Sequence, residues 1–177
     1  MHLAKNIRAN FAPVPTKPGV YKWWCDLGTL NTILEKIDLD KTIDINKNIE
    51  KYEHDEHEEP TLYCVYIGIA KNLRASIKWH IKDHTSSQLS STPIRVSTLR
   101  HTLASIFLGT IDLSINGGLN DLIDTFYISF EGNNNRHEVE KAALSKNSPH
   151  VYILNIQENE HDLAPKTILK KLRKDAL

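Results

Sequence analysis

Three runs along the chain combine hydrophobic positions with the β-branched and aromatic residues that favour extended backbone. They predict strands over residues 19–25, 61–68 and 125–132. The second run is almost continuously apolar, which is typical of a strand covered on both faces. The third run alternates apolar and polar residues, and this pattern predicts a half-exposed strand.

Between and after these runs, apolar residues recur with the spacing of a helix that has one buried side. This spacing predicts helices over residues 30–37, about 72–84, 97–109, 136–147 and about 164–177. Ser97 is expected to cap the third of these helices, and Gly109 lies just past its end. Residues 115–121 have the composition of a turn-rich connection, and residues 150–155 are expected to be extended.

The order of these elements predicts an α/β (α+β) fold, with helices flanking a small antiparallel sheet of three strands. A length of 177 residues suits one domain, so we expect a single domain over residues 1–177. Residues from about 38 to 60 are polar and acidic, and we interpret them as a surface insertion. The basic C-terminal helix, over about residues 164–177, is expected to be amphipathic.

Composition narrows the class of protein. No run of about 18 apolar residues occurs and the N-terminus has no continuous apolar stretch, so neither a membrane helix nor a signal peptide is expected. Cys25 and Cys64 make no disulfide framework and no zinc ligand set, which favours free thiols in the cytoplasm.

Charge is balanced overall but segregated along the chain. There are 22 basic and 22 acidic residues, and zero net charge argues against indiscriminate DNA binding. The acidic residues concentrate in residues 50–60, and the cations gather in residues 71–84, 95–101 and 166–174. This distribution is compatible with one anionic and one cationic face.

Two short motifs of glycine and tyrosine lie in the first two predicted strands, Gly19-Val20-Tyr21 and Tyr66-Ile67-Gly68. In an antiparallel pair of strands, the two tyrosines would converge on one point. Glycine at both positions would let the backbone turn and let a ligand approach closely. The motifs therefore mark a candidate site at these two strands.

In this order, and followed by "AKNL" and a basic helix, the motifs resemble those of GIY-YIG nucleases. The resemblance covers about residues 18–155 and includes Glu140, nine residues before Pro149. It implies a nuclease fold and hydrolysis of DNA phosphodiester bonds with one divalent ion per active site. Glu140 would hold this ion, Mg²⁺ or Mn²⁺, because a carboxylate is the hard oxygen ligand that Mg²⁺ prefers.

The resemblance also implies roles for other side chains. Tyr21 and Tyr66 would surround the attacking water, although a phenol relays a proton only if a metal or a nearby cation lowers its pKa. His80 ends a segment similar to the family pattern "NLxxRxxxxH" and is expected to hydrogen-bond or to transfer a proton. Glu138 would project away from Glu140 and is expected at the surface.

The sequence departs from the family at the arginine of that pattern, because Ser76 stands in its place. Three arginines are candidates for contacting the scissile phosphate instead: Arg74, Arg95 and Arg100. Lys78 is an alternative source of positive charge. The expected nucleic-acid contacts are Gly68, Lys71, Lys78 and Arg95, with the basic C-terminal helix.

Several alternatives stay open at this point. His80 and His84 are spaced for a transition metal, but no third ligand is evident. Asn155 either replaces the asparagine that closes the family's last motif, three residues late, or is a polar group at a strand end.

The function also has alternatives. We expect a restriction- or defence-type endonuclease that acts on DNA, with a homodimer as the form that cuts both strands. Without a suitable cation, the chain would be a nucleic-acid-binding domain that does not cut. A third hypothesis is a protein-interaction module whose acidic insertion contacts a basic partner.

Overall fold

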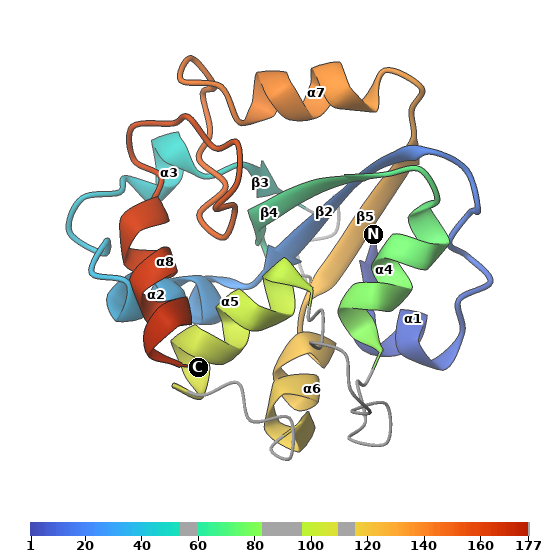
Figure 1. Cartoon of the computed structure of the whole chain (residues 1–177), viewed down its shortest axis with the longest axis horizontal. Helices are drawn as coiled ribbons and strands as arrows, with labels where there is room; N and C mark the ends of the chain where they lie inside the picture. Colours follow the sequence, from blue (N-terminus) through green and yellow to red (C-terminus); the bar gives the residue numbers. More distant parts are fainter. Residues whose placement is uncertain (54–59, 83–96, 110–115, 177) are drawn as a thin grey trace.

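A computed structural model describes residues 1–53, 60–82, 97–109 and 116–176. Within these residues, a five-stranded antiparallel sheet forms the centre of the fold (Figure 1). Its strands, in the sheet order β1-β5-β2-β4-β3, are β1 (His2–Leu3), β5 (Tyr127–Gly132), β2 (Gly19–Cys25), β4 (Leu62–Ala70) and β3 (Lys51–Tyr52).

The three predicted strands are confirmed as β2, β4 and β5, but the expected strand number of three is wrong. The two additional strands lie at the edges, where β1 pairs with β5 and β3 pairs with β4. Each contains only two residues. A strand this short produces no alternation of apolar and polar positions, so sequence periodicity could not detect it.

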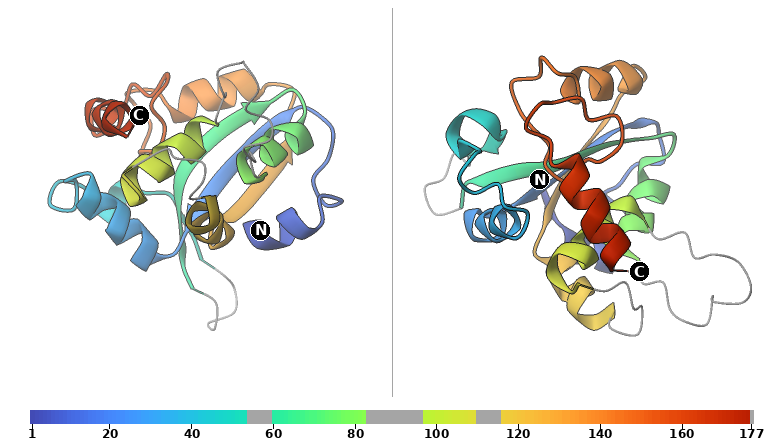
Figure 2. Two further views of the ribbon diagram at one scale, coloured as in Figure 1. Left: turned by 60° about the horizontal axis from the view of Figure 1, so that its bottom comes forward. Right: turned by 60° about the vertical axis from the view of Figure 1, so that its left-hand side comes forward.

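Helices cover both faces of the sheet (Figures 1 and 2). Their bounds are α1 (Ala4–Ala9), α2 (Leu27–Lys36), α3 (Ile45–Asn48), α4 (Leu73–Ile81), α5 (Thr98–Phe107), α6 (Asn116–Asp124), α7 (Arg136–Ala143) and α8 (Lys166–Asp175). The five predicted helices are confirmed as α2, α4, α5, α7 and α8, and the Ser97 side chain caps α5 by accepting from the Arg100 N–H. None of the helices in the described residues has the length and apolar character that a membrane crossing needs.

Two expectations about loops are wrong. Helix α6 occupies most of the segment expected to be a turn-rich connection, because Leu119 and Ile123 are buried in the core and this packing outweighs the cost of glycine in a helix. Residues 38–53 are not a simple surface loop either. They contain α3 and β3, and the buried Ile43 and Ile49 belong to the main core.

The core has one part on each face of the sheet. On one face, Tyr21 and Trp23 of β2 pack with apolar residues of α1, α2, α4, α5, α6 and α8. On the other face, Val20 and Trp24 pack with Leu144, which follows α7. Cys25 and Cys64, expected to be free thiols, are both free and buried.

Candidate active site

Tyr21 and Gly68 are direct partners in the antiparallel pairing of β2 with β4. The Tyr21 phenol occupies the space above Gly68, because a Cβ at position 68 would lie 2.6 Å from the Tyr21 hydroxyl oxygen. Gly68 is buried and accommodates this phenol. The space above Gly68 is therefore filled by this phenol and not left open for a ligand, whereas the expected contact of Gly68 with nucleic acid stays a prediction.

Regular pairing of β2 with β4 places Tyr66 on the face that carries Tyr21. Tyr66 pairs with Trp23 in the same register in which Gly68 pairs with Tyr21, and residues two apart on a strand share a face. A β-bulge begins only beyond this stretch, because Trp24 pairs with Cys64 and Val65 is the extra residue. The rings of Tyr21 and Tyr66 consequently lie on one face with centroids 6.3 Å apart, and a hydrogen bond joins the two hydroxyls. The expected convergence of the two tyrosines is confirmed.

A chain of buried hydrogen bonds continues from Tyr21 to helix α5. The Tyr21 hydroxyl lies 2.7 Å from Nε2 of His80, and Nδ1 of His80 lies 2.9 Å from Oγ of Ser97. The exposed fractions of Tyr21, His80 and Ser97 are 4%, 6% and 2%. Both ring nitrogens of His80 are therefore engaged within the protein, which leaves no free nitrogen for a transition metal. His84, its expected companion, lies outside the described residues.

Burial determines the protonation states along this chain. Together, burial and the smaller effect of the nearby Arg100 guanidinium lower the pKa of His80 to about 3. Burial also raises the pKa of Tyr21 well above its ordinary value and raises the pKa of Tyr66 to about 12. The hydrogen bond from Tyr21 opposes the effect of burial at Tyr66, because it lowers the Tyr66 pKa.

Tyr66 and Glu140 meet at a cavity of about 140 Å³. The described residues that line it are Tyr66, Thr98, Glu140, Asn155, Ile156, Gln157 and Glu158. Glu140 is partly buried on α7, and both burial and the charge of Glu158 raise the pKa of its carboxyl group. Glu138 is exposed, as expected.

Asn155 attaches the segment after α7 to strand β4. Its Oδ1 accepts from the Ile67 N–H at 2.9 Å, and its Nδ2 donates to the Ile67 carbonyl at 2.8 Å. These two bonds hold Asn155 beside the Tyr66-Ile67-Gly68 motif. The side chain is buried and bridges the segment after α7 and strand β4.

The two candidate arginines in the described residues bind main-chain carbonyl groups. Arg74 donates to the carbonyls of Val14 and Ala12, at 2.7 and 3.3 Å. Arg100 is 1% exposed, and its guanidinium donates to the carbonyls of His80 and Ile81 at the end of α4. Neither side chain is among the described residues that line the cavity.

The other expected cationic contacts lie at the surface or outside the described residues. Lys71 and Lys78 are exposed, and the Lys78 Nζ lies 5.9 Å from the ring centroid of Phe11. Arg95 lies outside the described residues. Of the lining residues that sequence reasoning missed, Thr98, Gln157 and Glu158 bear polar side chains, and no local pattern distinguishes them from ordinary surface positions.

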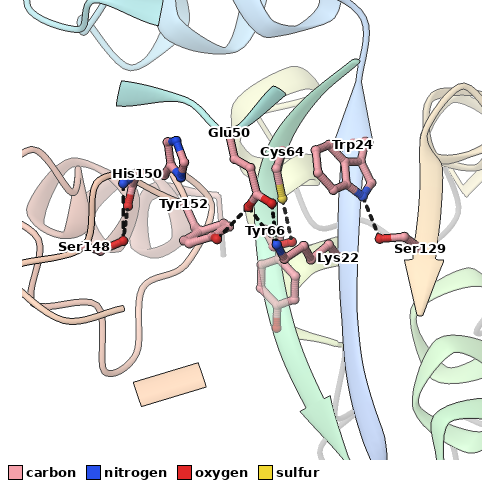
Figure 3. Close-up of polar contacts among 9 residues, drawn as sticks. All are labelled: Lys22, Trp24, Glu50, Cys64, Tyr66, Ser129, Ser148, His150 and Tyr152. Atoms are coloured by element: carbon pink, nitrogen blue, oxygen red, sulfur yellow. Dashed lines mark hydrogen bonds and ion pairs between the residues drawn. The ribbon is translucent and has the colours of Figure 1, made fainter. Parts of the chain in front are cut away.

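A separate polar cluster lies on the opposite face of the sheet (Figure 3). Glu50 accepts hydrogen bonds from Lys22 at 2.5 and 2.7 Å and from the Tyr152 hydroxyl at 2.7 Å. The Lys22 Nζ also lies 5.7 Å from the Trp24 ring centroid. Because these charges are paired with one another, the cluster joins β2, the segment before β3 and the segment after α7.

The donor atoms at the cavity suit a hard divalent cation. Glu140 and Glu158 offer carboxylates, and Tyr66 and Thr98 offer neutral oxygens. Mg²⁺ is commonly bound through one or two carboxylates and keeps several waters. No group of three or more His, Cys, Asp or Glu side chains arranged for a metal occurs in the described part of the chain.

The chain matches a known family of nucleases, in agreement with the two tyrosines and the glutamate of this site. The family model for the GIY-YIG catalytic domain matches residues 19–175. No curated protein and no solved structure shows significant similarity to the chain. Because the match spans most of the sequence, including both tyrosine motifs and Glu140, the chain belongs to the GIY-YIG nuclease superfamily, whose catalytic domain implies endonuclease activity on DNA.

Proposed function

We propose that this protein is a divalent-metal-dependent endonuclease that hydrolyses DNA phosphodiester bonds at the cavity between Tyr66 and Glu140. One observation carries the proposal. The hydrogen-bonded series Ser97, His80, Tyr21 and Tyr66 ends at the cavity where Glu140 lies. Such a series can hold and move a proton beside a carboxylate, which phosphodiester hydrolysis requires.

Glu140 would hold one ion, Mg²⁺ or Mn²⁺, on its carboxylate. When bound, this ion would neutralise charge on the phosphate and assist departure of the leaving oxygen. The remaining chemistry belongs to the side chains. Tyr66 lines the cavity directly, so its hydroxyl is the group that orients the attacking water and takes its proton.

The hydrogen bonds around His80 can make Tyr66 a better base. A neutral imidazole donates from one ring nitrogen and accepts at the other. If the Ser97 hydroxyl donates to Nδ1, then the Nε2–H of His80 donates to Tyr21, and Tyr21 donates to Tyr66. This direction favours deprotonated Tyr66, and a cation at the cavity would lower its pKa further.

We propose that Arg95 or Lys78 contacts the scissile phosphate, since the Arg74 and Arg100 side chains bind main-chain carbonyls. Arg100 would then act as a positioning residue, because it holds the end of α4 next to His80. Lys71 and the basic face of α8 would contact the DNA backbone.

Cleavage of supercoiled plasmid tests the proposed function. The purified protein is expected to nick or linearise the plasmid with Mg²⁺ or Mn²⁺, and Glu140→Gln is expected to abolish cutting. Glu138→Gln, an exposed position on the same helix, is the matched control and should cut normally. An intact plasmid with the unaltered protein and both metals would contradict the proposal. Linear product without a nicked intermediate would support the predicted homodimer and a restriction- or defence-type role.

One observation favours a second candidate, a nucleic-acid-binding domain that does not cut. Among the described residues, the cavity lining contains no arginine and no lysine. In that case DNA binding would weaken steeply with salt, whereas no product would form with either metal.

A further inference from the structure

Glu158 has an uncommon backbone conformation at the edge of the candidate active site. Its φ is 57°, in the left-handed region that residues other than glycine rarely adopt. Among the described residues, only Asp38 shares this feature, with a φ of 55°. Strain of this kind persists only where neighbouring contacts impose it.

Those contacts surround Glu158 on both sides. Before it, Asn155 is attached to β4 through its two bonds with Ile67. After it, the buried Asn159 side chain donates to the carbonyls of Tyr152 and Asn155, at 3.1 and 3.2 Å. The Glu160 N–H then donates to the Leu144 carbonyl at 2.7 Å. The backbone of Glu158 is thus held in place by hydrogen bonds of the residues around it.

The result is two carboxylates at one cavity. Glu140 comes from α7 and Glu158 from the segment after it, and the two negative charges repel each other. The described residues lining the cavity include no basic side chain that would compensate this repulsion. Two carboxylates facing one small polar space are the protein ligands that a hydrated divalent cation uses.

We propose that Glu158 is a second carboxylate ligand of the divalent ion that Glu140 holds. The inference rests on the proposed function, because it concerns the same metal. It predicts that the chain's affinity for the ion depends on both residues, and that the held conformation of Glu158 serves to direct its carboxylate toward the cavity.

The test is Mn²⁺ binding to the full chain without DNA, measured from the electron paramagnetic resonance signal of free Mn²⁺. Glu158→Gln is expected to raise the Kd about tenfold or more, as loss of a metal-site group commonly does. Glu160→Gln, an exposed glutamate two residues further on, is the matched control and should leave the Kd unchanged.

Glu158→Gly separates metal binding from folding. Glycine adopts a positive φ without strain, so the Tm of the metal-free variant should be unchanged or higher. Its Kd for Mn²⁺ should nevertheless rise as in Glu158→Gln. Weaker binding by a protein that is equally stable or more stable would identify the carboxylate itself as the cause.

The outcomes distinguish this inference from the proposed function. If Glu140→Gln loses Mn²⁺ binding and plasmid cleavage while Glu158→Gln keeps the Kd of the unaltered protein, the role of Glu158 is overturned and the nuclease remains. If the unaltered protein binds no Mn²⁺, or if Glu140→Gln binds it normally, the metal site fails and the role of Glu158 fails with it.

Discussion

Gly68 lies beneath the phenol of Tyr21, close enough that a Cβ at position 68 would stand 2.6 Å from the Tyr21 Cζ atom. The two residues are partners across β2 and β4. This contact explains why the second motif ends in glycine next to a tyrosine of the first. Because the residue at position 68 has no side chain, the Tyr21 phenol fits above it and reaches the hydrogen bond between Tyr21 and His80.

Gly68→Ala should therefore displace Tyr21 and disturb the proton relay. Overpacking of this kind is expected to lower the free energy of unfolding by about 1–3 kcal/mol. Plasmid cleavage should fall at least about tenfold, because a displaced Tyr21 no longer orients Tyr66. Urea unfolding and cleavage assays measure the two effects.

Gly118→Ala is the matched control for this change. A Cβ at position 118 would meet only Leu108 Cδ2, at an ordinary 3.9 Å. Since alanine favours a helix over glycine, this variant should gain roughly 0.5–1 kcal/mol of stability and cut normally. Unaltered stability and cleavage in Gly68→Ala would contradict the packing role of Gly68.

Tyr66→Phe should remove the group that accepts a proton from water while leaving the ring in place. We expect the cleavage rate to fall roughly 10²–10⁴-fold, the usual contribution of general base catalysis. Tyr21→Phe should cause a smaller loss, because Tyr21 acts through Tyr66. Single-turnover cleavage rates, measured across a range of pH, show which of the two variants loses more activity. Equal losses in the two variants would argue against Tyr66 as the base.

His80 should make the protein less stable in acid. Its folded pKa of about 3 lies below the ordinary value of 6.5, so between these values the unfolded chain binds a proton that the folded chain does not. Stability must then fall as the pH falls from about 6.5 toward 3, by up to about 1.4 kcal/mol per pH unit.

Urea unfolding between pH 7 and pH 5 measures this dependence. His80→Gln should be less stable at pH 7, since it disturbs the bonds to Tyr21 and Ser97, but its stability should change less with pH. His137→Gln, at an exposed position, should keep the full dependence. The same pH slope in His80→Gln and in the unaltered protein would show that His80 is not the responsible group.

Ser76→Arg should restore a cation near the site. Ser76 lies one helical turn before His80, so the two side chains share a face of α4. The added guanidinium should strengthen DNA binding and steepen its salt dependence by about one counterion. Ala75→Arg, an exposed neighbour on another side of α4, should steepen the salt dependence equally without raising the cleavage rate. If Ser76→Arg and Ala75→Arg cut DNA at the same rate, position 76 is not where a cation contacts the scissile phosphate.

Local hydrophobic patterns were sufficient to predict the longer strands and five of the helices. Strands β2, β4 and β5 and helices α2, α4, α5, α7 and α8 are visible in the sequence through residues a few positions apart, whereas α1, α3 and α6 are not. The edge strands β1 and β3 could not be found in this way. They exist because β4 and β5 provide hydrogen-bonding partners, and a partner distant in the sequence leaves no local pattern.

The candidate site shows the same difference between what local sequence reveals and what distant contacts decide. By itself, the sequence determined the family, because Tyr21, Tyr66 and Glu140 stand in an order and at spacings that are visible along the chain. Tertiary structure decided the rest: the register of β2 with β4 that places Tyr66 beside Tyr21, the attachment of Arg74 and Arg100 to carbonyls, and the presence of Glu158 at the cavity. These features depend on contacts between residues far apart in the chain, and only folding determines which side chain meets which.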